Sequence, residues 1–175
     1  MLSRLSTAGL RALNLAGKKV LPIVQGGMGV GVSAHRLAGS VAREGAVGTV
    51  ASVDLRHHHP DLLEQSHRQP KEYIDNLHLI ALDREIKAAR ELSGGNGLIA
   101  VNVMKAVKEH GQLVRQACAS GADAIVMGAG LPLDLPEMTA SHPKVALIPI
   151  LSDARGIALL LKKWMRKGRL PDAIV

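Results

Sequence analysis

Short apolar runs alternate with longer amphipathic stretches along most of the sequence. In the longer stretches apolar residues recur at steps of three and four, as in Leu37, Ala38, Val41 and Ala42. A short buried run followed by such a stripe is the pattern of a strand followed by a helix. The predicted strands are residues 20–24, 46–52, 98–103, 124–127, 145–151 and 171–175. Strands that alternate with helices in this way form a parallel sheet through right-handed crossovers.

Two parallel architectures fit this alternation, an open doubly wound sheet and a closed barrel. A barrel needs eight strands and about 250 residues, whereas these 175 residues reach only the beginning of a sixth strand. No linker or internal repeat divides the chain. We therefore expect residues 1–175 to form a single domain, with residues 1–19 as a lead-in that only faintly resembles an organelle transit peptide.

Polar residues and glycines mark the ends of the predicted helices. Ser33 is expected to cap the helix after the first strand, and Ser152 or Asp153 the helix after the fifth. A long helix is predicted from about Pro70 to Leu92, and the His-rich stretch before it is predicted to be a loop.

Composition excludes several classes of protein. Aromatic residues make up 1% of the chain and Phe is absent, which argues against a reader of single-stranded nucleic acid. The net charge of +7 is spread out except at residues 162–169, which we interpret as the solvated face of a helix.

No apolar run is long enough to span a bilayer. Cys118 is the only cysteine, so a reducing, cytoplasmic location is expected.

The most unusual stretch is QGGMGVG at residues 25–31, here called the glycine loop. In both parallel architectures ligands bind at the carboxyl ends of the strands, where this loop follows the first predicted strand. Glycines let the backbone approach a flat or anionic ligand closely. The loop is not a phosphate loop, because no Gly-Lys-Ser/Thr follows, and it matches the dinucleotide fingerprint poorly. The sequence leaves two interpretations of the glycine loop, a ligand cradle and a tight strand-to-helix turn.

Other small or amide residues are predicted at the same end of the sheet. Asn102 falls at the end of the third strand, Gly128 and Gly130 at the end of the fourth, and Ser152 at the end of the fifth. Together they would line one mouth, and the Asn102 amide could both donate to and accept from a heterocycle. The alternative is that Asn102 caps a helix and the glycines only turn the chain.

For several other candidate residues the sequence pattern favours a structural role over a functional one. The adjacent residues His57, His58 and His59 diverge too much to reach one metal ion, so we predict no metal site. His35 is expected to face solvent and Cys118 to be part of the core. Two acidic residues near the mouth, Asp134 and Glu137, are interpreted as helix-capping or turn residues.

Three segments in combination resemble a known family. PIVQGGMGVGVS, the strand ending in VNVM, and GADAIVMGAGLPLDLPE followed by LPDAIV are similar to the flavin-dependent nitronate monooxygenases, or 2-nitropropane dioxygenases. These enzymes are relatives of the flavin-containing enoyl-acyl-carrier-protein reductases. The resemblance runs from about Leu15 to Val175 and implies a partial TIM (β/α)8 barrel, with about six of the eight strands, that holds FMN at the carboxyl ends of the strands.

The resemblance also implies which residues contact FMN. Gln25, Gly26, Gly27, Met28 and Gly29 would lie along the isoalloxazine ring. Asn102 would bond to the flavin, Gly128 and Ala129 would pack against the ring, and Ser152 is a weaker assignment. In relatives the sixth strand leads to a catalytic histidine and then to a phosphate site, and the sequence ends before both. We therefore assign no catalytic residue and expect a fragment that is inactive alone.

The expected function is part of an FMN-dependent oxidoreductase, a flavoprotein that oxidises alkyl nitronates with oxygen to a carbonyl compound and nitrite. One alternative is an enoyl-acyl-carrier-protein reductase that uses NADPH, and another is a noncatalytic α/β binding module. The expected partners are a small-molecule substrate, a nitronate or an enoyl thioester, with NAD(P)H as an optional donor. We expect no nucleic-acid or membrane partner, and unpaired sheet edges favour a homo-oligomer.

Overall fold

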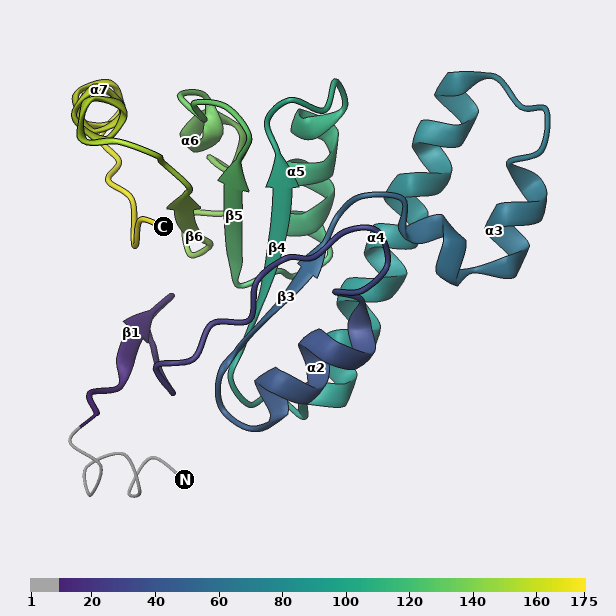
Figure 1. Cartoon of the computed structure of the whole chain (residues 1–175), viewed down its shortest axis with the longest axis horizontal. Coiled ribbons are helices and arrows are strands. Elements are labelled where there is room, and N and C mark those ends of the chain that lie inside the picture. The colour runs from purple at the N-terminus through teal and green to yellow at the C-terminus, as the bar shows by residue number, and fades with distance from the viewer. Residues whose placement is uncertain (1–9) are drawn as a thin grey trace.

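A four-stranded parallel sheet forms the centre of the molecule (Figure 1). The computed structural model describes residues 10–175. The strands β3 (Val47–Ala51), β4 (Leu98–Met104), β5 (Ala124–Gly128) and β6 (Ala146–Pro149) lie side by side in chain order. The helices between them are α2 (His35–Arg43), α4 (Lys71–Ser93), α5 (His110–Ala119) and α6 (Leu135–Met138), and α7 (Ala154–Met165) follows β6. This confirms the α/β fold and the parallel sheet.

Alternating residues of each strand divide the apolar core into two layers. In β4, Ile99 and Val101 pack against the helices, while Leu98 and Ala100 belong to a smaller cluster on the opposite face. Because side chains of a strand point to the two faces in turn, both faces of this sheet must be covered, as in other parallel sheets. We call the face without helices the inner face.

Extended segments continue the sheet at both edges, where the first and sixth strands were predicted. On one edge the Leu21 N–H donates to Gly45 O (2.8 Å) and the Gln25 N–H to Val47 O (2.9 Å). On the other edge the Val175 N–H donates to Pro149 O (3.1 Å), but the Leu147 N–H bonds to the Asp172 carboxylate instead of a main-chain carbonyl. The first edge thus has only an isolated bridge, between Val24 and Val47, and the ladder of the second edge is interrupted at Leu147.

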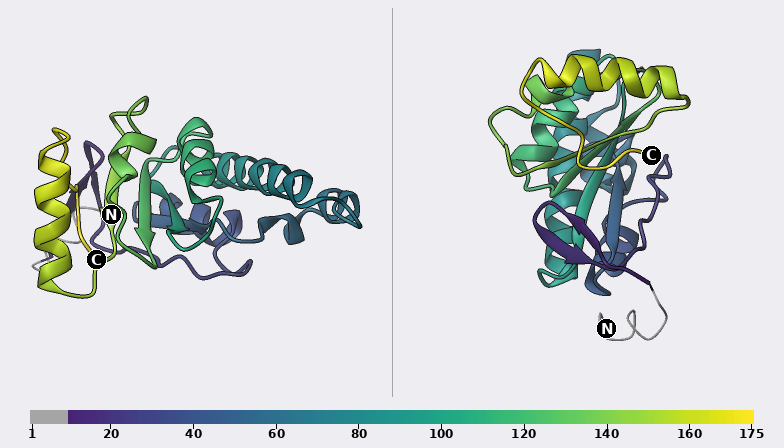
Figure 2. Two further views of the ribbon diagram at one scale, coloured as in Figure 1. Left: turned by 90° about the horizontal axis from the view of Figure 1, so that it is seen from above. Right: turned by 90° about the vertical axis from the view of Figure 1, so that its left-hand side faces the viewer.

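The predicted lead-in contains a hairpin that the sequence did not reveal. β1 (Leu13–Leu15) pairs antiparallel with β2 (Lys18–Val20). Ala16 and Gly17 both have positive φ, 50° and 73°, as a two-residue hairpin turn requires. The hairpin lies near the amino ends of the strands (Figures 1 and 2), and its buried residues Leu15 and Val20 join the inner-face cluster. The transit-like residues 1–9 lie outside the described part of the chain.

The His-rich stretch is helical where a loop was predicted. It forms a 3-10 turn, η1 (Leu55–His58), and a short helix, α3 (Pro60–Gln65). Pro60 at the first position of α3 favours this start, because its missing N–H would have no partner there. The predicted long helix is confirmed as α4, and Asp153 is the cap of α7, since its Oδ1 accepts from the Gly156 N–H at 2.8 Å. No helix among residues 10–175 has the length and apolarity to cross a membrane.

Candidate functional site

The inner face carries a cavity of about 430 Å³, here called the inner cavity. Its wall includes one layer of the sheet, because Asn102 is in register with Val126, and Val126 with Ile148. The hairpin, the glycine loop and the carboxyl-terminal segment complete it. The other lining residues are Leu13, Asn14, Leu15, Val24, Gln25, Gly26, Gly27, Thr49, Ile150, Asp172, Ala173, Ile174 and Val175.

The glycine loop meets Asn102 at this cavity. A Cβ atom added to Gly27 would lie 2.8 Å from Asn102 Cγ and nearer still to its Cβ, whereas one added to Gly26 would meet nothing within 4 Å. Gly27 is therefore needed for the loop to pass directly over the Asn102 side chain. Asn102 does not cap a helix, because α5 begins at His110 and Glu109 occupies its cap position.

Gln25 and Ser33 fix the shape of the glycine loop. The Gln25 side chain accepts from the Thr49 N–H (2.8 Å) and donates to Ser33 Oγ (2.8 Å). Ser33 Oγ in turn accepts from the Met28 N–H (2.9 Å) and donates to Gly26 O (3.0 Å). The prediction that Ser33 caps α2 is wrong for this reason: its hydroxyl is used by the loop, and Ala34 is the cap residue.

Two polar side chains on the wall of the inner cavity are available to form hydrogen bonds with a ligand. Thr49 is buried, and its hydroxyl has no hydrogen-bond partner in the described structure. The Asn102 amide likewise makes no hydrogen bond to a side chain or backbone group of residues 10–175. Since buried polar groups are costly when unpaired, an apolar cavity with these two groups is suited to an organic ligand with a few polar atoms.

A second cavity of about 380 Å³, the mouth cavity, opens beside the first at the carboxyl ends of β5 and β6. Ala129 and Ser152 line it, and Ile150 and Val175 line both cavities. Gly128 lies behind this junction, where an added Cβ would come within 2.9 Å of Ile150 Cβ. Most of the residues predicted at the ends of four strands thus surround two adjoining cavities.

Two of the predicted residues lie away from both cavities. Met28 is 47% exposed, and Gly29 faces the loop after β3, where an added Cβ would lie 3.8 Å from Val53 Cβ. The structure therefore brings Gln25, Gly26, Gly27 and Asn102 together on one wall of the inner cavity, and Ala129 and Ser152 to the adjoining mouth cavity.

A buried carboxylate that the sequence did not single out holds the start of α2, the helix that follows the glycine loop. Glu85 of α4 has 0% exposure. Its Oε2 accepts from the His35 N–H (2.6 Å) and lies 2.8 Å from His35 Nδ1, and its Oε1 lies 3.1 Å from His59 Nε2. His35, which was expected to face solvent, has a side chain that is 32% exposed and is held on its other side by this contact. The only sequence signal is a charged residue on the apolar stripe of α4 beside Leu82, Ile86 and Ala89.

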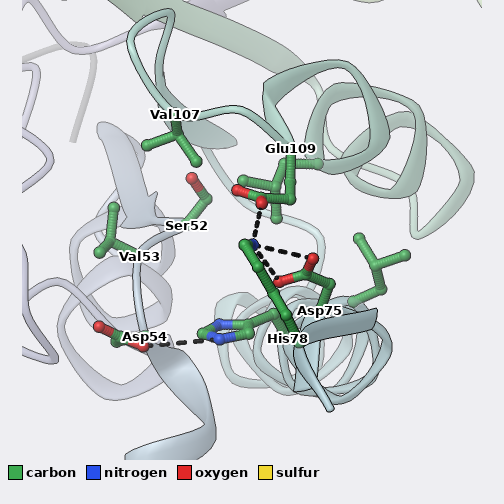
Figure 3. Close-up of a pocket in the computed structure, with 10 residues that line it drawn as sticks. Ser52, Val53, Asp54, Asp75, His78, Val107 and Glu109 are labelled. Atoms are coloured by element: carbon green, nitrogen blue, oxygen red, sulfur yellow. Dashed lines mark hydrogen bonds and ion pairs between the residues drawn. The ribbon is translucent and has the colours of Figure 1, made fainter. Parts of the chain in front are cut away.

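A third cavity, of about 180 Å³, lies on the helix side of the sheet, and we call it the helix-side cavity (Figure 3). The loop after β3 supplies Ser52, Val53 and Asp54, α4 supplies Lys71, Asp75, His78 and Leu79, and the α5 region supplies Val107, Glu109 and Leu113. Lys71 bonds to Asp75 (2.9 Å) and to Glu109. These contacts raise the pKa of Lys71 and lower that of Glu109.

The other candidate residues have structural roles. No group of three or more His, Cys, Asp or Glu side chains between residues 10 and 175 is arranged to hold a metal ion. Cys118 is buried, and burial raises the pKa of its thiol to about 11, as expected of a core residue. Asp134 pairs with Lys105, and Glu137 with Lys167.

Solved structures show where this fold occurs in other proteins. FabK from Thermotoga maritima, a TIM-barrel enzyme, superposes with a TM-score of 0.59 and 19% identity, over 87% of this chain and 39% of FabK. This likeness identifies the fold as part of a TIM barrel.

Two further structures are similar at lower scores. Dihydrodipicolinate synthase from Bacillus clausii has a TM-score of 0.41 and 13% identity, over 71% of this chain and 41% of that one. Nitroalkane oxidase from Streptomyces ansochromogenes has a TM-score of 0.37 and 15% identity, over 88% of this chain and 64% of that one. The chain spans less than two thirds of each of the three structures.

Sequence comparison gives the family. No curated protein matches the chain. The sequence model for nitronate monooxygenase matches residues 13–175, which include the hairpin, the glycine loop and both cavities of the inner face. The chain belongs to the nitronate monooxygenase family.

Proposed function

We propose that this chain binds FMN with the isoalloxazine ring at the inner cavity, as part of an FMN-dependent oxidoreductase. The observation that carries the proposal is the meeting of the glycine loop and Asn102 on one wall of an apolar cavity at the carboxyl ends of the strands. Ligands of parallel α/β folds bind at this end. The family match supports the choice of a flavin.

The residues of the cavity fit such a cofactor. Its volume of about 430 Å³ is within the usual range for organic ligands. The bare backbone at Gly26 leaves room for a flat ring, and the unpartnered Thr49 hydroxyl and the Asn102 amide can bond to its polar edge. Val126, Ile148 and Ile150 would exclude water from the apolar part. The mouth cavity, with Ala129 and Ser152, is where a substrate would approach.

The flavin would supply the redox chemistry, and the protein would orient it and shield it from water. For the substrate we propose an alkyl nitronate, which oxygen converts to a carbonyl compound and nitrite. The family match supports this class. No side chain of residues 10–175 is assigned to proton transfer, so the proposal concerns binding and orientation by this chain.

FMN retention is the direct test of binding. The purified chain should be mixed with FMN and desalted, and should keep the flavin's yellow absorbance. Wild-type protein that loses all FMN would contradict the proposal, and binding to nucleic acid that falls steeply with salt would then favour a noncatalytic module.

A second candidate reaction is the reduction of enoyl thioesters with NADPH. It is favoured by the fold likeness to FabK, an enoyl-acyl-carrier-protein reductase. Assays on the full gene product separate the two reactions. Nitrite release from a nitronate supports the first, and NADPH oxidation that depends on an enoyl thioester supports the second.

A further inference from the structure

The helix-side cavity is separate from the proposed flavin site. None of its lining residues lines the inner cavity or the mouth cavity. It lies between the loop after β3, the amino-terminal half of α4 and the connection from β4 to α5 (Figure 3). Neither the glycine loop nor Asn102 contributes to its wall, so the proposed function leaves it unexplained.

Ser52 provides an unused buried hydroxyl on this wall. The residue is 2% exposed, and its Oγ has no hydrogen-bond partner among residues 10–175. Its backbone is fixed, because the Ser52 N–H donates to Asn102 O at 3.0 Å. A buried hydroxyl without a partner is unfavourable, and a molecule in the cavity could supply that partner.

His78 provides a hydrogen-bond donor in the same cavity. Its Nε2 lies 2.7 Å from Arg56 Nη1. A guanidinium can only donate, so Nε2 must accept, and the proton of the neutral ring is on Nδ1. Burial, and then the charge of Arg56, lower the pKa of His78, which favours this neutral ring. The Nδ1–H has no acceptor within the described residues and is free for a ligand.

The charges around the cavity disfavour ionic ligands. Asp54, Asp75 and Glu109 face it, which opposes an anion. A cation would meet the donor edge of His78 and the Lys71 ammonium, and the three carboxylates are already paired, Asp75 and Glu109 with Lys71 and Asp54 with Arg56 outside the wall. A neutral ligand with N–H groups could still donate to a carboxylate oxygen.

The remaining wall is aliphatic and the space is small. Val53, Leu79, Val107 and Leu113 provide apolar surface. The volume is about 180 Å³, and a cavity of roughly 150 Å³ is enough to hold benzene. The ligand should therefore have about six non-hydrogen atoms, with a compact branched body.

We propose that the helix-side cavity is a binding site for a small neutral molecule that joins a branched aliphatic body to a carbonyl or primary amide group. The carbonyl oxygen accepts from Ser52 Oγ–H and His78 Nδ1–H. The amide N–H groups donate to the carboxylates at the rim, and the aliphatic body contacts the valines and leucines.

Three molecules of the same shape and different charge test this assignment. Isobutyramide is neutral, isobutyrate is its anionic counterpart, and isobutyramidine is its cationic counterpart. Each is titrated into the purified chain, with and without FMN, while NMR follows the Hε1 signal of His78. Isobutyramide should bind saturably and shift this signal, and isobutyrate should bind at least about tenfold more weakly because of the carboxylates.

Two serine variants provide the matched control. Ser52→Ala should weaken isobutyramide binding by roughly three- to tenfold, the usual effect of one lost hydrogen bond. Ser141→Ala, on the exposed surface beside His142, should leave binding unchanged. Thermal melting checks that both variants are folded.

Several outcomes would overturn the proposal. Absence of saturable binding would mean that only water fills the cavity. Tightest binding of isobutyrate or isobutyramidine would mean an ionic site, and equal affinity of wild type and Ser52→Ala would mean that the amide binds elsewhere. Because the titrations do not require FMN, they can succeed or fail independently of the flavin proposal.

Discussion

The inner cavity and the helix-side cavity lie on opposite faces of the same sheet and are built by opposite means. The inner cavity owes its shape to missing side chains, since Gly26 and Gly27 expose the backbone beside Thr49 and Asn102. The helix-side cavity is walled by charged groups that pair with one another, such as Lys71 with Asp75. The first arrangement suits a broad flat ligand and the second a small one. Substitutions should affect the two cavities differently.

The largest effect is expected at Glu85, the buried carboxylate of α4 that holds the start of α2. Glu85→Ala removes the buried acceptor of the His35 N–H and the carboxylate that lies 3.1 Å from His59 Nε2. We expect a loss of about 2–4 kcal/mol in the free energy of unfolding, together with weaker FMN binding because α2 follows the glycine loop. Urea unfolding and flavin fluorescence measure these effects.

A control for Glu85 lies on the same helix. Asp83→Asn alters a carboxylate that bonds to Lys87 and Ser120 near the surface, and it should change FMN binding little. Glu85→Gln, which keeps an acceptor for the His35 N–H, should recover part of the loss. If Glu85→Ala were as stable as Asp83→Asn, the role of this carboxylate as a support would be wrong.

The next effect is expected at Gly27, in the inner cavity alone. Gly27→Ala would force the loop away from Asn102 and cost about 1–3 kcal/mol as overpacking. FMN affinity should fall by at least about tenfold, while isobutyramide binding in the helix-side cavity should not change. Gly26→Ala is the matched control for stability, because its Cβ would meet no protein atom within 4 Å. Wild-type FMN affinity in Gly27→Ala would exclude close contact between loop and ring.

A pH effect is expected from the helix-side cavity alone. The pKa of His78 is lowered from 6.5 by burial and by Arg56. As the pH falls below 6.5, the unfolded chain binds a proton at this residue more readily than the folded chain, so stability decreases. His78→Gln should show a shallower decrease from about pH 6.5 towards pH 5 in urea unfolding. An unchanged slope would mean that His78 titrates alike in both states.

The smallest effect is expected at the rim of the helix-side cavity. The Lys71 side chain is 64% exposed, and exposed ion pairs contribute little to stability. Lys71→Met should leave the melting temperature close to that of wild type and should make it less dependent on salt. A large drop in melting temperature would show that the ion pairs with Asp75 and Glu109 are structurally important.

The sequence predicted those parts of the fold that depend on apolar periodicity. The central strands and α4 were found in this way, because burying a stripe or an alternating face leaves a local pattern. The hairpin was missed because its turn is Ala-Gly and not one of the usual Asn-Gly or Asp-Gly pairs. α3 was missed because its charged and histidine residues show little apolar pattern.

The candidate site was predictable where it depends on the backbone. Glycines at a strand end and an amide in a buried strand are visible in the sequence, so Gly27 and Asn102 could be paired. The contacts of Ser33 with the glycine loop and of Glu85 with His35 depend on tertiary packing, which brings together residues 50 positions apart in the latter case. Local propensity assigned Ser33 to a helix cap because it cannot register such competing partners.

The hairpin also matters for any processing of the amino terminus. Removal of residues 1–19 as a leader would delete β1 and most of β2, and with them Leu13, Asn14 and Leu15 from the floor of the inner cavity. Val20, now 2% exposed, would then meet water. A protease that trimmed the chain there would leave the cavity open to solvent from below.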